Sequence, residues 1–177
     1  GLLVLHQQQA FGHFHVGAKI GARMAGATLE PRGTLRPMFT PEQLDRANAF
    51  CKGTLMETLG IVFVPADGPD EVAATMPVGP HNHQPMGLLH GGATAALAES
   101  LGSTSSYMLL EGSRRAVVGI EVSANHLKAV RSGIVKAVGK LVHRGRSIHV
   151  WDIHVTNERG ELTAVCRLTN MVIDREP

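Results

Sequence analysis

The sequence predicts an α+β fold in which an antiparallel sheet wraps around one long central helix. Two patterns carry this prediction. Residues 91–110 are long enough for a helix and almost wholly small or apolar, with Glu99 as the only charge, and a helix without a polar face is normally buried. Strand-like runs then follow without an intervening helical pattern. Short turns between successive strands indicate antiparallel pairing around that helix.

The first predicted helix begins at a capping box. Thr40 can accept a hydrogen bond from Gln43, the third helical residue, and Pro41 suits the first helical position. Apolar residues then recur on one face, at Leu44, Ala47, Phe50 and Cys51. This spacing predicts an amphipathic helix of about three turns that packs on the core.

Strands bounded by turn residues are predicted on both sides of the central helix. They cover residues 61–64, 71–78, 116–128, 133–143, 147–156 and 161–173. A loop rich in Pro, His and Asn, residues 77–85, precedes the central helix. The tight connections at 144–146 and 157–160 are typical of hairpins. We therefore expect the strands after the helix to form a meander.

The chain divides into an arm and one domain. Residues 1–37 show little periodicity, so residues 1–40 are predicted to form an N-terminal extension, partly disordered or packed on a partner. No linker or internal repeat divides the remainder. Residues 41–177 are accordingly predicted to form a single domain.

Composition argues against several classes of function. A net charge of +2 is too small to indicate a nucleic-acid-binding protein, and no apolar run approaches the roughly 18–20 residues of a membrane span. Cys51 and Cys166 lie far apart, which favours reduced thiols in a cytoplasmic protein. Two His-x-His pairs, at 13–15 and 81–83, lack further ligand residues beside them, so neither a metal nor a cofactor is expected.

Two features of the central helix carry the candidate chemistry. His90, Gly91 and Gly92 stand where the helix begins, and free backbone N–H groups there can stabilise a developing negative charge. Glu99 places a carboxylate in an apolar helix, which costs on the order of several kcal/mol unless the group is paired or used in catalysis. A salt-bridged or hydrogen-bonded core glutamate, or a helix face that reaches solvent, is the structural alternative.

Helix geometry separates these two features. His90 and Glu99 are nine positions apart, which is about 13.5 Å along the axis and roughly half a turn out of phase. Because they point to opposite sides, joint action on one substrate atom requires a site shared between two subunits. Ser103 follows Glu99 by four residues on the same face, where it can contact the same substrate.

Basic residues concentrate between residues 114 and 146. This segment has eight Lys and Arg residues against one acid, Glu121, an imbalance that suits a phosphate-bearing ligand. The eight are Arg114, Arg115, Lys128, Arg131, Lys136, Lys140, Arg144 and Arg146. Solvent-facing strand charges explain the pattern equally well, so the residues alone leave both interpretations open.

Three stretches together resemble PaaI-like hotdog thioesterases, in particular the subgroup of the bacterial 1,4-dihydroxy-2-naphthoyl-CoA thioesterase. They are Q-P-M-G-L-L-H-G-G, six intervening residues and then E-S at 84–100, V-V-G-I-E-V-S-A-N-H at 117–126, and residues 143–151. The first stretch is the specific one, because its Gln, His, Gly pair and Glu recur in the family's order and spacing. The resemblance covers residues 59–173 and leaves the arm outside.

The resemblance implies a hotdog fold, dimerised edge to edge and paired into a homotetramer, and hydrolysis of an aryl- or medium-chain acyl-CoA without a cofactor. Glu99 would be the nucleophile or general base, with Ser103 assisting nearby. Gln84, His90 and the Gly91 amide would polarise the thioester carbonyl from the opposite subunit. Implied CoA contacts are Gly119, His126, Leu127, Lys128, Ala129, His143, Arg144, Gly145, Arg146, Ser147 and Ile148, with Lys128, Arg144 and Arg146 at phosphates.

Two other functions compete with hydrolysis. A hotdog protein that binds acyl-CoA as a regulator needs no Glu99 and would carry a DNA-binding module, but residues 1–58 show no clear helix-turn-helix. A hotdog hydratase typically has an Asp/His pattern on a different loop, which this sequence does not match. The residues that flank the site are apolar, namely Met86, Leu88 and Leu89. They favour an apolar acyl group, and aromatic and medium-chain groups both fit.

Overall fold

The computed structural model describes residues 37–175. The helices are α1 (Pro41–Phe50), α2 (Leu55–Thr58) and α3 (Gly91–Met108), with a short 3-10 helix η1 (Pro80–Asn82). The strands are β1 (Val62–Val64), β2 (Glu71–Val78), β3 (His83–Gln84), β4 (Leu88–Leu89), β5 (Arg115–His126), β6 (Gly133–Arg144), β7 (Ile148–Asn157) and β8 (Leu162–Asp174). The predicted arm, residues 1–40, lies almost wholly outside the described residues, as does the first His-x-His pair.

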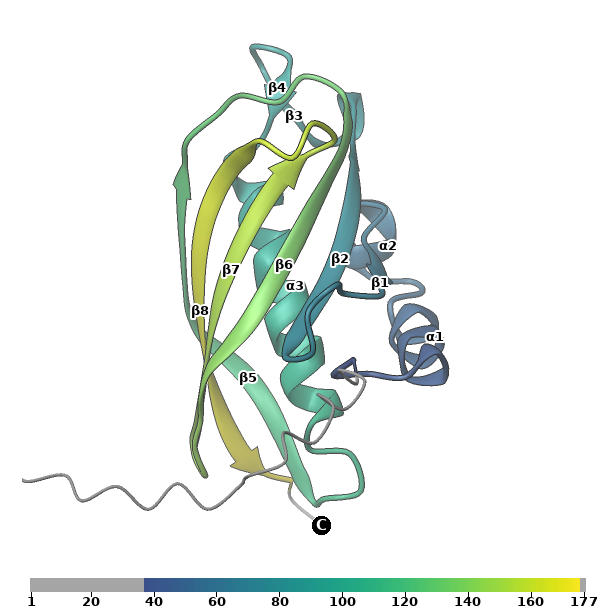
Figure 1. Ribbon diagram of the computed structural model, residues 1–177, viewed down its shortest axis with the longest axis vertical. Helices are drawn as coiled ribbons and strands as arrows, with labels where there is room; N and C mark the ends of the chain where they lie inside the picture. The colour runs from purple at the N-terminus through teal and green to yellow at the C-terminus, as the bar shows by residue number, and fades with distance from the viewer. Residues whose placement is uncertain (1–36, 176–177) are drawn as a thin grey trace, which may run out of the picture. The chain divides into compact units, whose positions relative to one another are not determined.

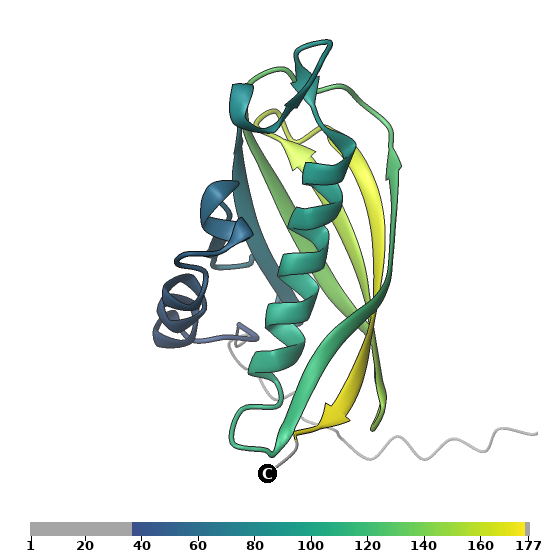
Figure 2. The same cartoon turned by 180° about the vertical axis from the view of Figure 1, so that it is seen from behind.

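One antiparallel sheet of six strands forms the body of the domain, in the order β1-β2-β6-β7-β8-β5. Helix α3 runs lengthwise along one face of this sheet (Figure 1, Figure 2). Helices α1 and α2 lie beside the edge formed by β1 and β2, and the small β3–β4 hairpin stands at the end where α3 begins. The predicted α+β fold, with its sheet wrapped around a long central helix, is confirmed.

The core lies between α3 and the sheet. Leu97 and Leu101 on α3 and Trp151 and Ile153 on β7 have no exposed surface. Gly102 allows this close packing, because a Cβ at that position would meet the Trp151 ring at 3.1 Å. An all-apolar helix is therefore stable here, since the sheet removes it from water.

Helix α1 begins with the predicted capping box. Thr40 Oγ1 accepts from the Gln43 amide at 3.3 Å, and Gln43 Oε1 accepts from the Thr40 amide at 2.9 Å. Leu44 is buried, but Phe50 is 64% exposed, so its predicted place on the core face was wrong. Phe50 follows Leu44 by six residues, about 120° around the helix, and it stacks on Tyr107 with 5.7 Å between ring centroids.

The order of the sheet differs from the expected meander at one strand. β6, β7 and β8 are successive neighbours, but β5 pairs with β8 instead of β6. Residues 127–132 carry the chain from β5 across the end of the sheet to β6 (Figure 1). The amides of Leu127 and Lys128 anchor this connection by donating to the Thr163 carbonyl. As a result β5, which is 12 residues long, becomes an edge strand.

Candidate active site

The N-terminus of α3 forms the first half of the candidate site. Amides in a first helical turn have no acceptor within the helix. Here the His90 carbonyl accepts from Ala93 and Thr94, and His90 Nδ1 accepts from the Gly92 amide at 2.8 Å. Among the residues that the structure describes, the Gly91 amide makes no such hydrogen bond. It is available to a substrate oxygen at the positive end of the helix dipole.

His90 is therefore the N-cap of α3 as well as a candidate polarising residue. Its Nδ1 accepts a hydrogen bond from an amide, so the proton of the neutral imidazole lies on Nε2. The side chain is exposed, which leaves the Nε2–H group as a donor suited to a carbonyl oxygen. Sequence reasoning missed the capping role, because His is not among the residues that favour N-caps.

A cavity of about 340 Å³ opens beside this end of α3. Gln84 and Gly91 line it together with residues 126–129, the first of the expected CoA segments. A Cβ on Gly91 would lie 2.7 Å from His126 Nε2, so the close approach of the imidazole requires glycine here. The fold thus gathers residues from the β3–β4 hairpin, α3 and the end of β5 around one cavity.

Glu99 forms the second half of the candidate site. It is half-buried near the middle of α3, and a Cβ on Gly119 of β5 would collide with its carboxylate. Ser103 Oγ donates to Glu99 Oε1 at 2.9 Å. Within residues 37–175 no Lys, Arg or His forms an ion pair with Glu99. Leaving a partly buried carboxylate without a cation is costly, which favours a functional role over a structural one.

The two halves contact opposite parts of the same strand. On β5, His126 lies against Gly91, whereas Gly119 lies against Glu99. Seven residues at about 3.3 Å each place Gly119 and His126 about 23 Å apart along the strand. One substrate atom therefore cannot be reached by both halves of a single chain.

The other expected CoA segment, residues 143–148, covers the end of β6, the β6–β7 turn and the start of β7, at the opposite end of the sheet from the cavity (Figure 1). The Gly145 amide donates to the Ile148 carbonyl at 2.8 Å and closes this turn. The Arg144 guanidinium donates to the Leu109 carbonyl at the C-terminus of α3, at 3.1 Å. Within one chain, the two expected CoA segments are thus separated, as the two halves of the candidate catalytic site are.

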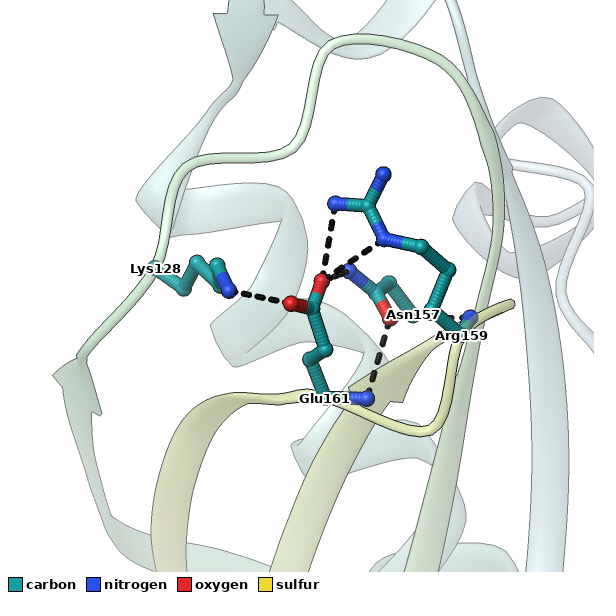
Figure 3. A network of polar contacts seen from close by, with 4 residues as sticks. All are labelled: Lys128, Asn157, Arg159 and Glu161. Atoms are coloured by element: carbon teal, nitrogen blue, oxygen red, sulfur yellow. Dashed lines mark hydrogen bonds and ion pairs between the residues drawn. The ribbon is translucent and has the colours of Figure 1, made fainter.

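Lys128, an expected phosphate contact, is bound to a carboxylate network (Figure 3). Its Nζ donates to Glu161 Oε1. The other carboxylate oxygen, Oε2, accepts from Asn157 Nδ2 at 2.8 Å and from Arg159 Nε at 2.9 Å. The hydrogen bonds from Asn157, Lys128 and Arg159 lower the pKa of Glu161 from 4.5 to about 2. The network ties the β5–β6 connection, which lines the cavity, to the β7–β8 turn.

We expect Glu161→Gln to lower the melting temperature at pH 7. Because the folded state lowers the pKa of Glu161 from 4.5 to about 2, the carboxylate stabilises the fold fully above pH 4.5 and loses this contribution as the pH falls towards 2. The difference in melting temperature between wild type and variant should therefore shrink between pH 7 and pH 3. Thermal unfolding of both proteins, with the exposed Glu158→Gln as control, measures it. A difference that stays constant with pH would contradict the assignment.

In the part of the chain that the structure describes, no group of residues indicates a metal site or a cysteine nucleophile. No three His, Cys, Asp or Glu side chains gather there as metal ligands. In the second His-x-His pair, His83 Nε2 bonds the Arg131 carbonyl at 2.9 Å. Burial raises the pKa of the Cys51 thiol and raises that of Cys166 to about 11, so neither is a ready thiolate. No helix among residues 37–175 is long and apolar enough to cross a bilayer.

Known proteins share this arrangement of sequence and fold. The model of a family described as "Thioesterase superfamily" matches residues 86–164. The 1,4-dihydroxy-2-naphthoyl-CoA hydrolase of Escherichia coli (strain K12) is 42% identical over 130 residues, which cover 73% of this chain and 94% of the relative. The chain belongs to the thioesterase superfamily.

Further relatives of this thioesterase support the same family assignment. The proofreading thioesterase EntH of Cronobacter sakazakii is 44% identical over 130 residues, covering 73% of this chain and 93% of the relative. The crystal structure of a mutant of thioesterase PA1618 from Pseudomonas aeruginosa matches with a TM-score of 0.71 at 45% identity, covering 74% of this chain and 94% of that one. The predicted hotdog fold and thioester hydrolase class are confirmed. The roles assigned to individual residues in the two halves of the site stay predictions.

Proposed function

We propose that this thioesterase hydrolyses an acyl-CoA thioester to a free acid and CoA, with Glu99 acting on the acyl carbon. The observation that carries the proposal is the Glu99 carboxylate itself. It is half-buried, bonded to Ser103, and without an ion-pair partner in the described residues. A carboxylate held this way is suited to one of two roles, nucleophile or general base.

The two roles differ in the first bond that forms. As a nucleophile, Glu99 adds to the acyl carbon, the C–S bond breaks, CoA leaves as the thiolate, and water then hydrolyses the resulting anhydride. As a general base, Glu99 takes a proton from a water whose oxygen attacks the acyl carbon, and the CoA thiolate leaves with a proton from the site or solvent. Neither route needs a metal or a cofactor, and we propose that none takes part.

The negative charge that develops on the thioester oxygen would be met at the N-terminus of α3. The Gly91 amide and the His90 Nε2–H group are the donors available there, and Gln84 lines the adjacent cavity. Fixed donors of this kind act where charge develops and need no rearrangement during the reaction. Gln84, His90 and Gly91 are therefore proposed to polarise the carbonyl.

We propose that the two halves of each site come from two subunits joined through β5. This strand is an edge of the sheet and exposes apolar side chains, among them Ile120, whose exposed fraction is 51%. Long exposed edge strands are normally paired or covered. The opposite edge, β1, has only three residues, so β5 is the edge with enough length and apolar surface to form a continuous interface.

The register of such a pair follows from the positions of the two halves. If two β5 strands pair antiparallel about a twofold axis near Val122 and Ser123, Gly119 of one subunit lies opposite the partner subunit's His126. Within each chain, Gly119 lies against Glu99 and His126 lies against Gly91. In this register each Glu99 therefore lies near the N-terminus of α3 in the partner subunit. The same pairing brings residues 143–148 of one subunit towards the partner's cavity, so both CoA segments serve one site.

The substrate is proposed to be an aryl- or medium-chain acyl-CoA. Lys128, Arg144 and Arg146 supply cations for the phosphates of CoA. Leu88 and Leu89 line the cavity, which suits an apolar acyl group. The name of the Escherichia coli relative specifies an aromatic acyl-CoA, which supports the aryl class. Edge-paired dimers are proposed to assemble further into a homotetramer, which the molar mass from light scattering would test.

A panel of aromatic and medium-chain acyl-CoA thioesters, assayed by detection of the free thiol, tests the proposed reaction. We expect release of CoA from at least one member of the panel. The matched control is Glu111→Gln, at an exposed carboxylate that pairs with Arg46 and should leave turnover unchanged. Tight binding of acyl-CoA without release of thiol would instead show a non-catalytic binding protein.

A further inference from the structure

A buried polar chain leads from the core towards Glu99. Ser106 on α3 lies at its inner end: Ser106 Oγ accepts from Trp151 Nε1 at 2.8 Å and from Asn170 Nδ2 at 3.1 Å, and it lies 3.0 Å from His149 Nδ1. Trp151 and Asn170 can only donate through these nitrogens, so the single Ser106 proton goes to His149. Burial, with Arg144, Arg115 and His143 adding to it, lowers the pKa of His149, in agreement with a neutral ring that accepts at Nδ1.

This arrangement fixes the orientation of the Asn170 amide. Its Nδ2 donates to Ser106 Oγ and also to the Gly102 carbonyl at 3.3 Å. A flipped amide would place its oxygen against that carbonyl and against a hydroxyl whose proton is already used. Asn170 Oδ1 must therefore point the other way, where it lies 3.0 Å from Ser103 Oγ. Asn170 has no exposed surface, so water does not replace this partner.

Ser103 consequently has two acceptors for one proton. Glu99 Oε1 lies 2.9 Å and Asn170 Oδ1 3.0 Å from Ser103 Oγ. When Glu99 is ionised, the charge-assisted bond to the carboxylate is the stronger of the two. When Glu99 carries a proton on the oxygen facing Ser103, it becomes the donor to Ser103, whose own proton can then turn to Asn170. For both protonation states of Glu99, the hydrogen bonds of this buried polar chain can thus be arranged so that each donor has an acceptor.

We propose that Asn170 is a positioning residue for Glu99 and that it acts through Ser103. Asn170 holds the Ser103 hydroxyl between itself and the carboxylate. On the general-base route, it accepts a hydrogen bond from Ser103 once Glu99 has taken a proton from the attacking water. This inference rests on the proposed function of Glu99. It adds that β8 belongs to the catalytic machinery although no atom of Asn170 needs to touch substrate.

A double-mutant cycle in the full-length protein tests the proposal. We expect Asn170→Ala to lower kcat about tenfold with KM nearly unchanged, the scale of coupling between residues in one hydrogen-bond network. In a Ser103→Ala background the same substitution should lower kcat less than about twofold, because the path to Glu99 is already broken. Equal losses in both backgrounds, or an unchanged kcat in Asn170→Ala, would overturn the proposal.

Two further variants separate this role from a general loss of structure. Ser105→Ala removes a fully buried hydroxyl from the same helix, one with no hydrogen-bond partner among the described residues, and should leave kcat unchanged. If Asn170→Ala does not fold, Asn170→Ser, which retains a polar group, takes its place in the cycle. Glu99→Gln is assayed alongside: full activity in that variant overturns the proposed function together with this inference. An inactive Glu99→Gln with additive Asn170 and Ser103 effects overturns this inference alone.

Discussion

Replacing Glu99 by Gln is expected to lower kcat for acyl-CoA hydrolysis at least about a hundredfold, the scale of general acid–base catalysis. The amide keeps the shape of the side chain and an oxygen that can accept from Ser103, but it has neither the charge to attack carbon nor the basicity to take a proton. The melting temperature should not fall, because the substitution removes a partly buried charge that has no ion-pair partner in the described residues.

Free-thiol release under saturating acyl-CoA, measured beside Glu111→Gln, gives the comparison. The control removes a carboxylate of the same type from the segment just after α3, where it is exposed and pairs with Arg46. If both variants retain the kcat of the wild type, Glu99 is not the catalytic group. A loss confined to Glu99→Gln with unchanged KM would indicate that the carboxylate acts in the transition state and contributes little to substrate binding.

Mixing two inactive variants is expected to restore activity. His90→Asn keeps a residue that favours the N-cap position of α3 but removes the Nε2–H donor, at a cost of about 10²–10³ in kcat. In a mixed dimer with Glu99→Gln, one of the two shared sites receives both substitutions and the other receives neither. After random exchange of subunits, an equimolar mixture should reach about one quarter of the wild-type activity.

The result depends on demonstrated exchange of subunits, which native mass spectrometry of two variants of different mass can follow. As a matched control, two preparations of Glu99→Gln that differ only in mass should exchange equally and stay inactive. Activity that does not rise in an exchanged mixture of His90→Asn and Glu99→Gln would mean that each site is built by one chain. It would then remove the proposed role of β5 as the strand that joins the two halves.

The sequence predicted most of the fold because its local signals are strong. The capping box at Thr40, the apolar run after Gly91 and the alternation in the later strands each depend on neighbouring residues alone, and the elements formed where expected. The position of β5 was not predictable in this way. Its pairing with β8 brings together residues that are 38 to 59 positions apart, through a connection, residues 127–132, that resembles an ordinary loop in sequence.

The residues of the candidate site likewise differ in whether the sequence alone could predict them. His90, Gly91 and Glu99 could be singled out because a glycine pair at a helix start and a lone carboxylate in an apolar helix are unusual on physical grounds. Asn170 gave no such signal, because one amide in an alternating strand becomes notable only when its buried partners are known. The double function of His90, as cap and as donor, likewise required the position of its ring nitrogens.

The place of β5 at the edge of the sheet also determines when, during synthesis of the chain, this strand can join the sheet. Its only partner in the described sheet is β8, the last of the described strands. While the ribosome makes the residues between them, at about 5–20 residues per second, β5 has no strand of its own chain to pair with. The newly made edge stays open until β8 emerges, and Asn170 arrives with it. A chain released before β8 would therefore lack the residue that positions Glu99. It would also expose the edges of β7 and β5 that pair with β8, which favours aggregation over assembly.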